Sequence, residues 1–113
     1  MKLCIDLDGT ICHVKKDDES YWDVQPLPGA VDAIQRLHAA GHYIIIYSAR
    51  HMGTQQANEG KVAAMRGYLY AWLDKWEIPY HEIYIKPLAD IYIDDRAYRH
   101  TDWESTVEFL NTL

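Results

Sequence analysis

Residues 3–10 read Leu-Cys-Ile-Asp-Leu-Asp-Gly-Thr, a short apolar run that delivers two acids into a turn of glycine and threonine. In an extended strand residues i and i+2 share a face, so Cys4, Asp6 and Asp8 tend to one side. Two carboxylates held this close at the end of a buried strand repel each other unless a cation lies between them, and Mg²⁺ prefers such oxygens. A plain Asp-Gly turn would explain the presence of Asp8 but not that of Asp6. The stretch therefore favours a catalytic site over a simple turn.

Three later apolar runs also stop at a reactive side chain. The runs and the residues that follow them are 43–47 before Ser48, 83–85 before Lys86, and 91–93 before Asp94 and Asp95. In an open α/β sheet the ligand lies outside the carboxyl ends of the strands. We therefore expect the acid pairs, the hydroxyl and the ammonium group to meet at one edge of a sheet.

This order of motifs resembles the haloacid dehalogenase (HAD) superfamily of phosphohydrolases: Asp-x-Asp-Gly-Thr, then serine, then lysine, then Asp-Asp, each after a predicted strand. Over about residues 1–105 the chain is also similar to small bacterial phosphatases found with capsule-biosynthesis genes. The stretches that carry this second similarity are 49–52, 58–61, 72–74, 78–83, 86–87 and 94–97. The resemblance implies a phosphatase.

Helical patterns alternate with the apolar runs. They cover residues 28–41 and about 60–77, and Asp102 can cap a last helix. This alternation predicts one α/β domain over residues 1–113, a Rossmann-like three-layer α/β/α sandwich with a mainly parallel sheet and helices on both faces. The superfamily resemblance implies a central first strand, and no segment is long enough for a cap domain.

The chemistry of phosphate esters assigns roles to the reactive residues. Asp6 would attack phosphorus and form an aspartyl-phosphate, which splits a very slow reaction into two easier steps. Asp8 would protonate the leaving alcohol and then take a proton from the attacking water. Ser48 and Lys86 would stabilise the non-bridging oxygens. The backbone N–H groups expected to assist them are those of Gly9 and Thr10.

A magnesium ion is the expected cofactor. We expect it to be held by a carboxylate oxygen of Asp6, the backbone carbonyl of Asp8 and one of Asp94 or Asp95. Adjacent strand residues face opposite sides, so only one of that pair can point at the ion. We favour Asp95 as the ligand, with Asp94 holding Lys86 or a metal-bound water.

Two polar segments border the expected site. Residues 12–27 are rich in charged and aromatic side chains and would form a flap over it, although a surface hairpin without a role is the alternative. Residues 51–60 follow Arg50 at the same edge. We expect Arg50, Lys61 and Trp22 to contact the substrate, with the walls of the site supplied by these segments or by a second subunit of a homo-oligomer.

Composition excludes several classes of protein. The chain has 113 residues and no apolar run near the roughly 20 residues that span a bilayer, and acids interrupt its first apolar stretch, as no signal peptide does. Cys4 and Cys12 match no metal-site spacing, so we expect free thiols in the cytoplasm. A net charge of −6 disfavours extensive, sequence-independent binding of nucleic acid.

Three functions therefore compete. The first is a Mg²⁺-dependent phosphatase acting on a small phosphorylated sugar or related metabolite, as the resemblance to capsule-associated phosphatases implies. The second keeps the chemistry but acts on a nucleic-acid 3′-phosphate or a phosphoprotein. The third is a non-catalytic binding domain that keeps the fold, which the intact reactive residues disfavour.

Overall fold

The structure is a computed structural model that describes residues 1–49 and 59–113, with the backbone alone over 59–66. Strands and helices alternate along the chain. They are β1 (Lys2–Asp6), α1 (Ala30–Ala39), β2 (Tyr43–Ser48), α2 (Glu59–Lys75), β3 (Glu82–Ile85) and α3 (Trp103–Asn111). The predicted α/β class, the three predicted helices and three of the four predicted strands are confirmed.

The three strands form one parallel sheet in the order β1-β2-β3. Ile5 pairs with Ile46, and Ile46 pairs with Ile83, so an apolar row crosses one face of the sheet and is buried. Because the strands are parallel, their carboxyl ends meet at one edge. That edge carries the residues of the candidate site.

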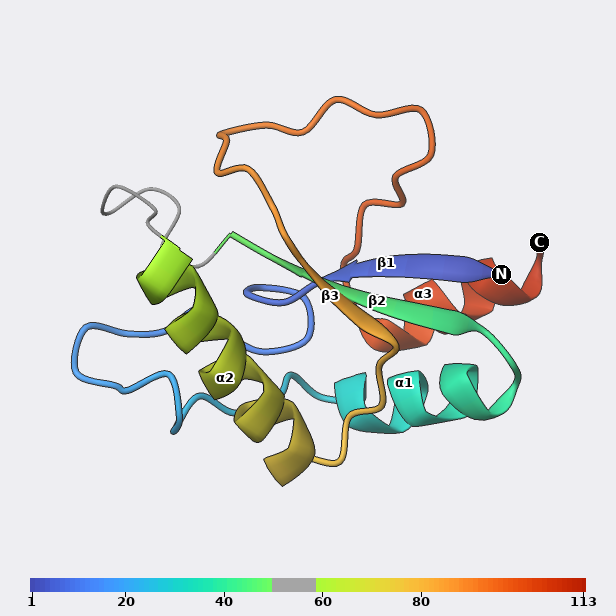
Figure 1. The fold of residues 1–113 in the computed structure, drawn as a ribbon. Helices are drawn as coiled ribbons and strands as arrows, with labels where there is room; N and C mark the ends of the chain where they lie inside the picture. Colours follow the sequence, from blue (N-terminus) through green and yellow to red (C-terminus); the bar gives the residue numbers. More distant parts are fainter. Residues whose placement is uncertain (50–58) are drawn as a thin grey trace.

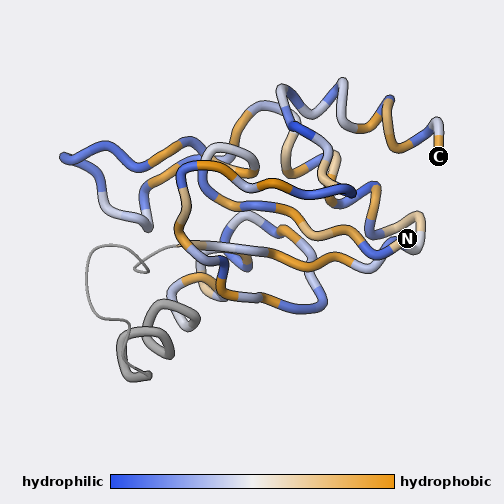
Figure 2. Tube along the Cα trace, turned by 90° about the horizontal axis from the view of Figure 1, so that it is seen from above, coloured by the Kyte–Doolittle hydropathy of each residue, from blue (hydrophilic) through white to orange (hydrophobic). Residues whose placement is uncertain are grey.

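The described helices α1, α2 and α3 lie on one side of the sheet in Figure 1, and residues 86–102 (the 86–102 segment) arch over the other side. The second helical layer of the expected sandwich therefore contains no described helix. None of the described helices is long and apolar enough to cross a membrane. Figures 1 and 2 show the hydrophilic middle of residues 12–27 projecting away from the sheet.

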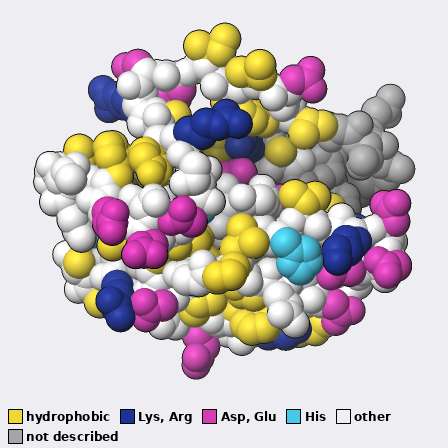
Figure 3. Space-filling model, turned by 180° about the vertical axis from the view of Figure 1, so that it is seen from behind, with side chains coloured by type: hydrophobic (Ala, Val, Ile, Leu, Met, Phe, Trp, Pro, Cys, Tyr) yellow, Lys and Arg dark blue, Asp and Glu magenta, His cyan; other side chains and the backbone are white. Residues whose placement is uncertain are grey.

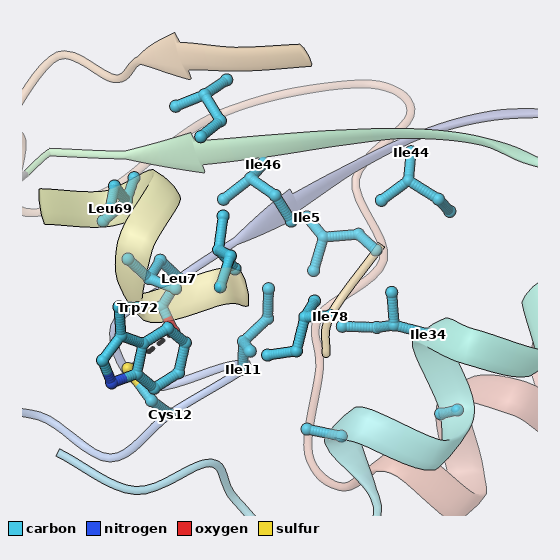
Figure 4. Packing of buried hydrophobic residues seen from close by; sticks show 14 of the residues in the cluster. Ile5, Leu7, Ile11, Cys12, Ile34, Ile44, Ile46, Leu69, Trp72 and Ile78 are labelled. Carbon is cyan, nitrogen blue, oxygen red and sulfur yellow. Dashed lines mark hydrogen bonds between the residues drawn. The ribbon is translucent and has the colours of Figure 1, made fainter. Parts of the chain in front are cut away.

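The core lies between the buried face of the sheet and the helices (Figure 4). The sequence predicts that Leu69, Trp72 and Leu73 share the inner face of α2, and all three are buried. The indole N–H of Trp72 donates to the carbonyl of Val24 at 2.9 Å, which ties residues 12–27 to the helix. The sequence pattern of α1 predicts one shared face for Val31, Ile34, Leu37 and His38. Ile34 and Leu37 are buried, but His38 is exposed.

The fourth predicted strand is not formed, and this prediction is wrong. Residues 91–93 pair with no described strand, and Ile91 and Ile93 are 76% and 96% exposed. Exposed hydrophobic side chains gather along the upper margin of the rear face in Figure 3, on the side where the 86–102 segment lies in Figure 1. The Tyr92 hydroxyl donates to the carbonyl of Pro87 at 2.5 Å and accepts from the N–H of Ala89 at 3.2 Å, so local bonds close this stretch on itself.

The position of β1 also differs from the expectation. With residues 91–93 unpaired, β1 lies at one edge of the described sheet and β2 lies at its centre. A central β1 would need a strand paired on each of its sides, and residues 91–93 do not supply the second one. Since that pairing is absent among the described strands, the prediction of a central β1 is wrong as well.

Candidate active site

The carboxyl ends of the three strands bring an acid, a hydroxyl and an amine together. Asp6 ends β1, Ser48 ends β2 and Lys86 directly follows β3. The Nζ of Lys86 lies 3.4 Å from Oδ1 of Asp6, and its backbone N–H donates to the carbonyl of Ser48 at 2.8 Å. Ser48 is only 1% exposed. Three of the four predicted catalytic residues thus lie at one edge of the sheet.

Burial has the largest influence on the pKa of Asp6. It raises the pKa of Asp6 above its ordinary value, and the ammonium group of Lys86 opposes this rise. The lysine is also bordered by two aromatic rings, with Nζ 3.9 Å from the ring centre of Tyr92 and 5.3 Å from that of Tyr47. Cation–π attraction and the carboxylate therefore both hold the lysine head at the strand ends.

Asp8 lies in a tight turn that follows β1. Gly9 has a φ of +85°, which favours glycine, and its N–H donates to the carbonyl of Cys12 at 2.7 Å. The N–H of Thr10 donates to the carbonyl of Leu7 at 3.2 Å. The N–H groups of Gly9 and Thr10, expected to assist phosphate binding, therefore make hydrogen bonds within the turn itself.

Two residues support this turn in ways that sequence reasoning missed. The indole N–H of Trp103, in the first turn of α3, donates to the carbonyl of Thr10 at 2.8 Å. The Sγ of Cys12 lies 3.6 Å from Oδ1 of Asp8. Trp103 is buried in the core, and Cys12 is a free thiol, as the spacing of the two cysteines predicts. No local pattern signals the first contact, because 93 positions separate its two residues.

The described residues do not complete the expected magnesium site. Asp6 ends β1 and Asp8 lies two residues later in the turn. Asp94 and Asp95 lie in the exposed 86–102 segment, where Asp94 accepts a hydrogen bond from the N–H of Arg96 at 2.6 Å. Among the side chains that the structure describes, those of residues 1–49 and 67–113, no group of three or more His, Cys, Asp or Glu lies close enough to hold a metal ion. The first acid pair fits one side of such an ion, and the second pair is not beside it.

Of the three expected substrate contacts, the structure describes the side chain of Trp22 alone. Arg50, like most of the 51–60 segment, lies outside the described residues, and Lys61 is described only as part of the α2 backbone. Trp22 lies against the last turn of α2, where the Nζ of Lys75 is 4.5 Å from its ring centre and donates to its carbonyl at 3.1 Å.

Similarity to solved structures identifies the fold. D,D-heptose 1.7-bisphosphate phosphatase from B. bronchiseptica, complexed with magnesium and phosphate, matches 85% of this chain and 53% of its own, at 18% identity and a TM-score of 0.55. A Pnkp1/Rnl/Hen1 complex matches 83% of this chain and 30% of its own, at 21% identity and a TM-score of 0.55. The protein therefore has a HAD-like α/β fold. It spans about half of the B. bronchiseptica chain and less than a third of the chain from the Pnkp1/Rnl/Hen1 complex.

A third structure shows a closer relationship. A crystal structure of a Vibrio cholerae protein is 33% identical, covers 98% of this chain and 97% of its own, and has a TM-score of 0.78. The chain belongs to the same family as that Vibrio cholerae protein. No protein-family model matches the sequence, and no curated protein matches it.

Proposed function

We propose that this protein is a phosphomonoester hydrolase that uses Asp6 as its nucleophile. The observation that carries the proposal is the pair formed by Asp6 and Lys86, with Nζ 3.4 Å from Oδ1, at the carboxyl edge of a parallel sheet and next to Ser48. Phosphoryl transfer needs a positioned nucleophile and positive charge near the non-bridging oxygens. This edge supplies both.

The reaction proceeds in two steps. A carboxylate oxygen of Asp6 attacks phosphorus, the bond from phosphorus to the ester oxygen breaks, and the carboxylic acid of Asp8 gives its proton to that oxygen as the alcohol leaves. Water then attacks the aspartyl-phosphate and passes a proton to the carboxylate of Asp8. The bond between Asp6 and phosphorus breaks, inorganic phosphate leaves, and both side chains return to their starting states.

Lys86 and Ser48 stabilise the phosphoryl group during both steps. Lys86 already faces Asp6 across 3.4 Å, so a phosphoryl group next to that oxygen lies within reach of the ammonium group. The rings of Tyr47 and Tyr92 limit the positions of the lysine head, which reduces the reorganisation needed when charge develops. Removing Lys86 should therefore affect the chemical step more than substrate binding.

A divalent cation is part of this proposal. Asp6 and the carbonyl of Asp8 would bind it on one side and Asp94 or Asp95 on the other, once the 86–102 segment lies closer to β1. Such an ion would offset the charge of the phosphate and of the nucleophile. The magnesium and phosphate in the B. bronchiseptica phosphatase, which shares the fold, support this assignment.

For the substrate we propose a small phosphorylated sugar or related metabolite. The sugar bisphosphate named for the B. bronchiseptica phosphatase supports this class, and the net charge of −6 disfavours a long nucleic-acid substrate. The two free cysteines support a reaction in the reducing cytoplasm.

The test is hydrolysis of p-nitrophenyl phosphate, followed by a panel of sugar phosphates, nucleotides and 3′-phosphorylated oligonucleotides. We expect turnover with Mg²⁺, and little turnover after the protein is dialysed against a chelator and assayed without metal. Ser48→Ala and Lys86→Met should both lower kcat, because each removes a group from the phosphate-binding edge. Absence of turnover on every ester would overturn the proposed function, and full activity without metal would overturn the cofactor.

A further inference from the structure

Cys12 is a fully buried thiol at the base of the candidate active site, and the proposed reaction does not use it. Its Sγ lies 3.6 Å from Oδ1 of Asp8 and 3.7 Å from the carbonyl oxygen of Leu7. Both distances suit a hydrogen bond from sulfur, so the S–H proton has a carboxylate oxygen and a carbonyl oxygen within reach. Which of them receives the proton decides what the thiol does.

The carbonyl of Leu7 is the weaker candidate because other donors already use it. It accepts the N–H groups of Thr10, Ile11 and Cys12 at 3.2, 2.9 and 3.1 Å. A carbonyl oxygen has two lone pairs, so three N–H donors exceed its usual capacity. A carboxylate oxygen of Asp8, with more acceptor capacity and negative charge, is the better acceptor for the thiol.

The backbone of Cys12 holds the same turn. Its carbonyl accepts the N–H of Gly9 at 2.7 Å, and bridges of β type join Cys12 both to Asp8 and to Pro26. The sulfur therefore sits on a backbone that is tied to the acid on one side and to the end of residues 12–27 on the other. A side chain placed in this way can fix the direction of a neighbouring carboxyl group.

We propose that Cys12 is a positioning residue for Asp8, a role that rests on the proposed function. Its S–H donates to Oδ1 of Asp8, so Oδ1 acts as a hydrogen-bond acceptor and does not carry the acidic proton. The proton that Asp8 gives to the leaving alcohol is then carried on Oδ2. Cys12 touches neither the substrate nor the reacting atoms, and it acts by holding the acid in the orientation that the protonation step requires.

A change in leaving group tests this role. An alkyl phosphate such as glycerol phosphate needs protonation of its leaving oxygen, whereas p-nitrophenolate leaves with little help. We expect Cys12→Ala to lower kcat on glycerol phosphate about tenfold and on p-nitrophenyl phosphate less than about threefold, with KM little changed. Cys12→Ser, which keeps a donor, should recover kcat on glycerol phosphate to within about threefold of wild type.

Control variants separate positioning from packing. Val24→Ala also removes apolar volume at a fully buried site, and it should lower the melting temperature without changing the ratio of the two kcat values. If Cys12→Ala does not fold, Cys12→Val replaces it, because valine fills a similar volume and has no donor. We expect the same loss of kcat on glycerol phosphate for Cys12→Val as for Cys12→Ala. Equal losses on both esters, or no recovery in Cys12→Ser, would overturn the role of Cys12.

A spectroscopic measurement keeps this inference separate from the proposed function. If wild-type protein hydrolyses neither ester, the proposed function fails, and the side-chain ¹³C resonance of Asp8 then tests the contact alone. We expect that resonance to move in Cys12→Ala and to return toward its wild-type position in Cys12→Ser. An unchanged resonance in Cys12→Ala would show that the thiol does not hold the carboxyl group.

Discussion

At the scale of single residues, Asp6 and Asp8 carry similar groups in different surroundings. Asp6 faces the ammonium group of Lys86 at the end of β1, whereas Asp8 lies in the following turn beside the thiol of Cys12. A carboxylate next to a fixed cation suits attack on phosphorus, and a carboxyl group held by a donor at one oxygen suits proton transfer. The surroundings therefore support two distinct roles.

Substitution of the two acids should give different results. Asp6→Asn should lower turnover of p-nitrophenyl phosphate at least about a thousandfold, because an amide cannot form the acyl-phosphate. Asp8→Asn should still accept phosphate from this ester and then hydrolyse the intermediate slowly, which rapid-quench measurements would detect as trapped phosphoprotein. If Asp6→Asn kept more than a few per cent of activity, free of deamidation, the covalent mechanism would be wrong.

The raised pKa of Asp6 also predicts how stability depends on pH. The folded protein binds this proton more tightly than the unfolded chain, so the resulting stabilisation is complete below the unfolded pKa and is lost as pH rises through the folded pKa. The ionised carboxylate therefore costs stability at neutral pH, and Asp6→Asn removes that cost. Thermal melts should show a larger gain for Asp6→Asn over wild type near pH 7 than near pH 3. A gain that is equal at both pH values would contradict this expectation.

At the scale of elements, α3 begins where the sequence predicts. The carboxylate of Asp102 accepts the N–H of Ser105 at 2.7 Å, and this bond lowers the pKa of Asp102. Because α3 starts with Trp103, whose indole N–H donates to the carbonyl of Thr10, the cap also helps to hold the turn that carries Asp8. The start of this helix thus links stability to function.

Loss of the cap should destabilise the protein in a pH-dependent way. Asp102→Ala should lower the melting temperature by roughly 5 °C at neutral pH, while Asp102→Asn should retain most of the wild-type value. Since the folded-state pKa is lowered, the stabilisation is present above the unfolded pKa and disappears as pH falls through the folded pKa. The gap between wild type and Asp102→Ala should therefore narrow in acid, and a constant gap would contradict the role of the carboxylate.

At the scale of the whole molecule, the site depends on contacts between distant parts of the chain. Trp103 in α3 packs its Cβ 3.4 Å from where a Cβ on Gly29 would lie, and its indole N–H reaches Thr10 in the turn after β1. One side chain thus joins the last helix, the start of α1 and the turn after β1. The last helix therefore helps to hold the turn that carries Asp8.

Removal of that indole donor should reach the active site. Trp103→Phe keeps most of the aromatic packing and loses the bond to the carbonyl of Thr10, a loss worth about 1 kcal/mol of stability. We expect kcat on p-nitrophenyl phosphate to fall severalfold at temperatures where the variant is fully folded. Phe109→Leu, at a partly exposed position of the same helix, serves as the control and should leave kcat unchanged. An unchanged kcat in Trp103→Phe would show that the turn holds its shape without α3.

The 86–102 segment is the other feature of the whole molecule that bears on function. If one acid of this segment joins a bound cation, Asp95→Asn should raise the Mg²⁺ concentration for half-maximal activity at least about tenfold, with a smaller effect for Asp94→Asn. Asp90→Asn, in the same segment, is the matched control and should behave as wild type. Titration of activity with Mg²⁺ checks this, and identical curves for all three variants would remove the acid pair from the metal site.

Much of this protein can be predicted from local patterns. The apolar runs that end at Asp6, Ser48 and Lys86 form parallel strands, because a period of two residues and the helices between them leave little choice. Asp102 predicts the start of α3 because its side chain satisfies a backbone N–H three residues later. Gly29 and Gly41 mark the two ends of α1 because both adopt the positive φ that favours glycine. Three of the predicted catalytic residues meet for the same reason: parallel strands bring their carboxyl ends to one edge.

Other features depend on the tertiary structure alone. The sequence predicts a fourth strand at residues 91–93, yet local bonds of Tyr92 and its ring over Lys86 hold that stretch away from β1. Trp22 is placed by Lys75, which lies 53 positions away. The sequence around Trp103 and the sequence around Thr10 give no sign of the contact between them. Strand pairing and side-chain contacts across the fold are chosen by competition among distant partners, and a periodic pattern carries no information about which partner wins.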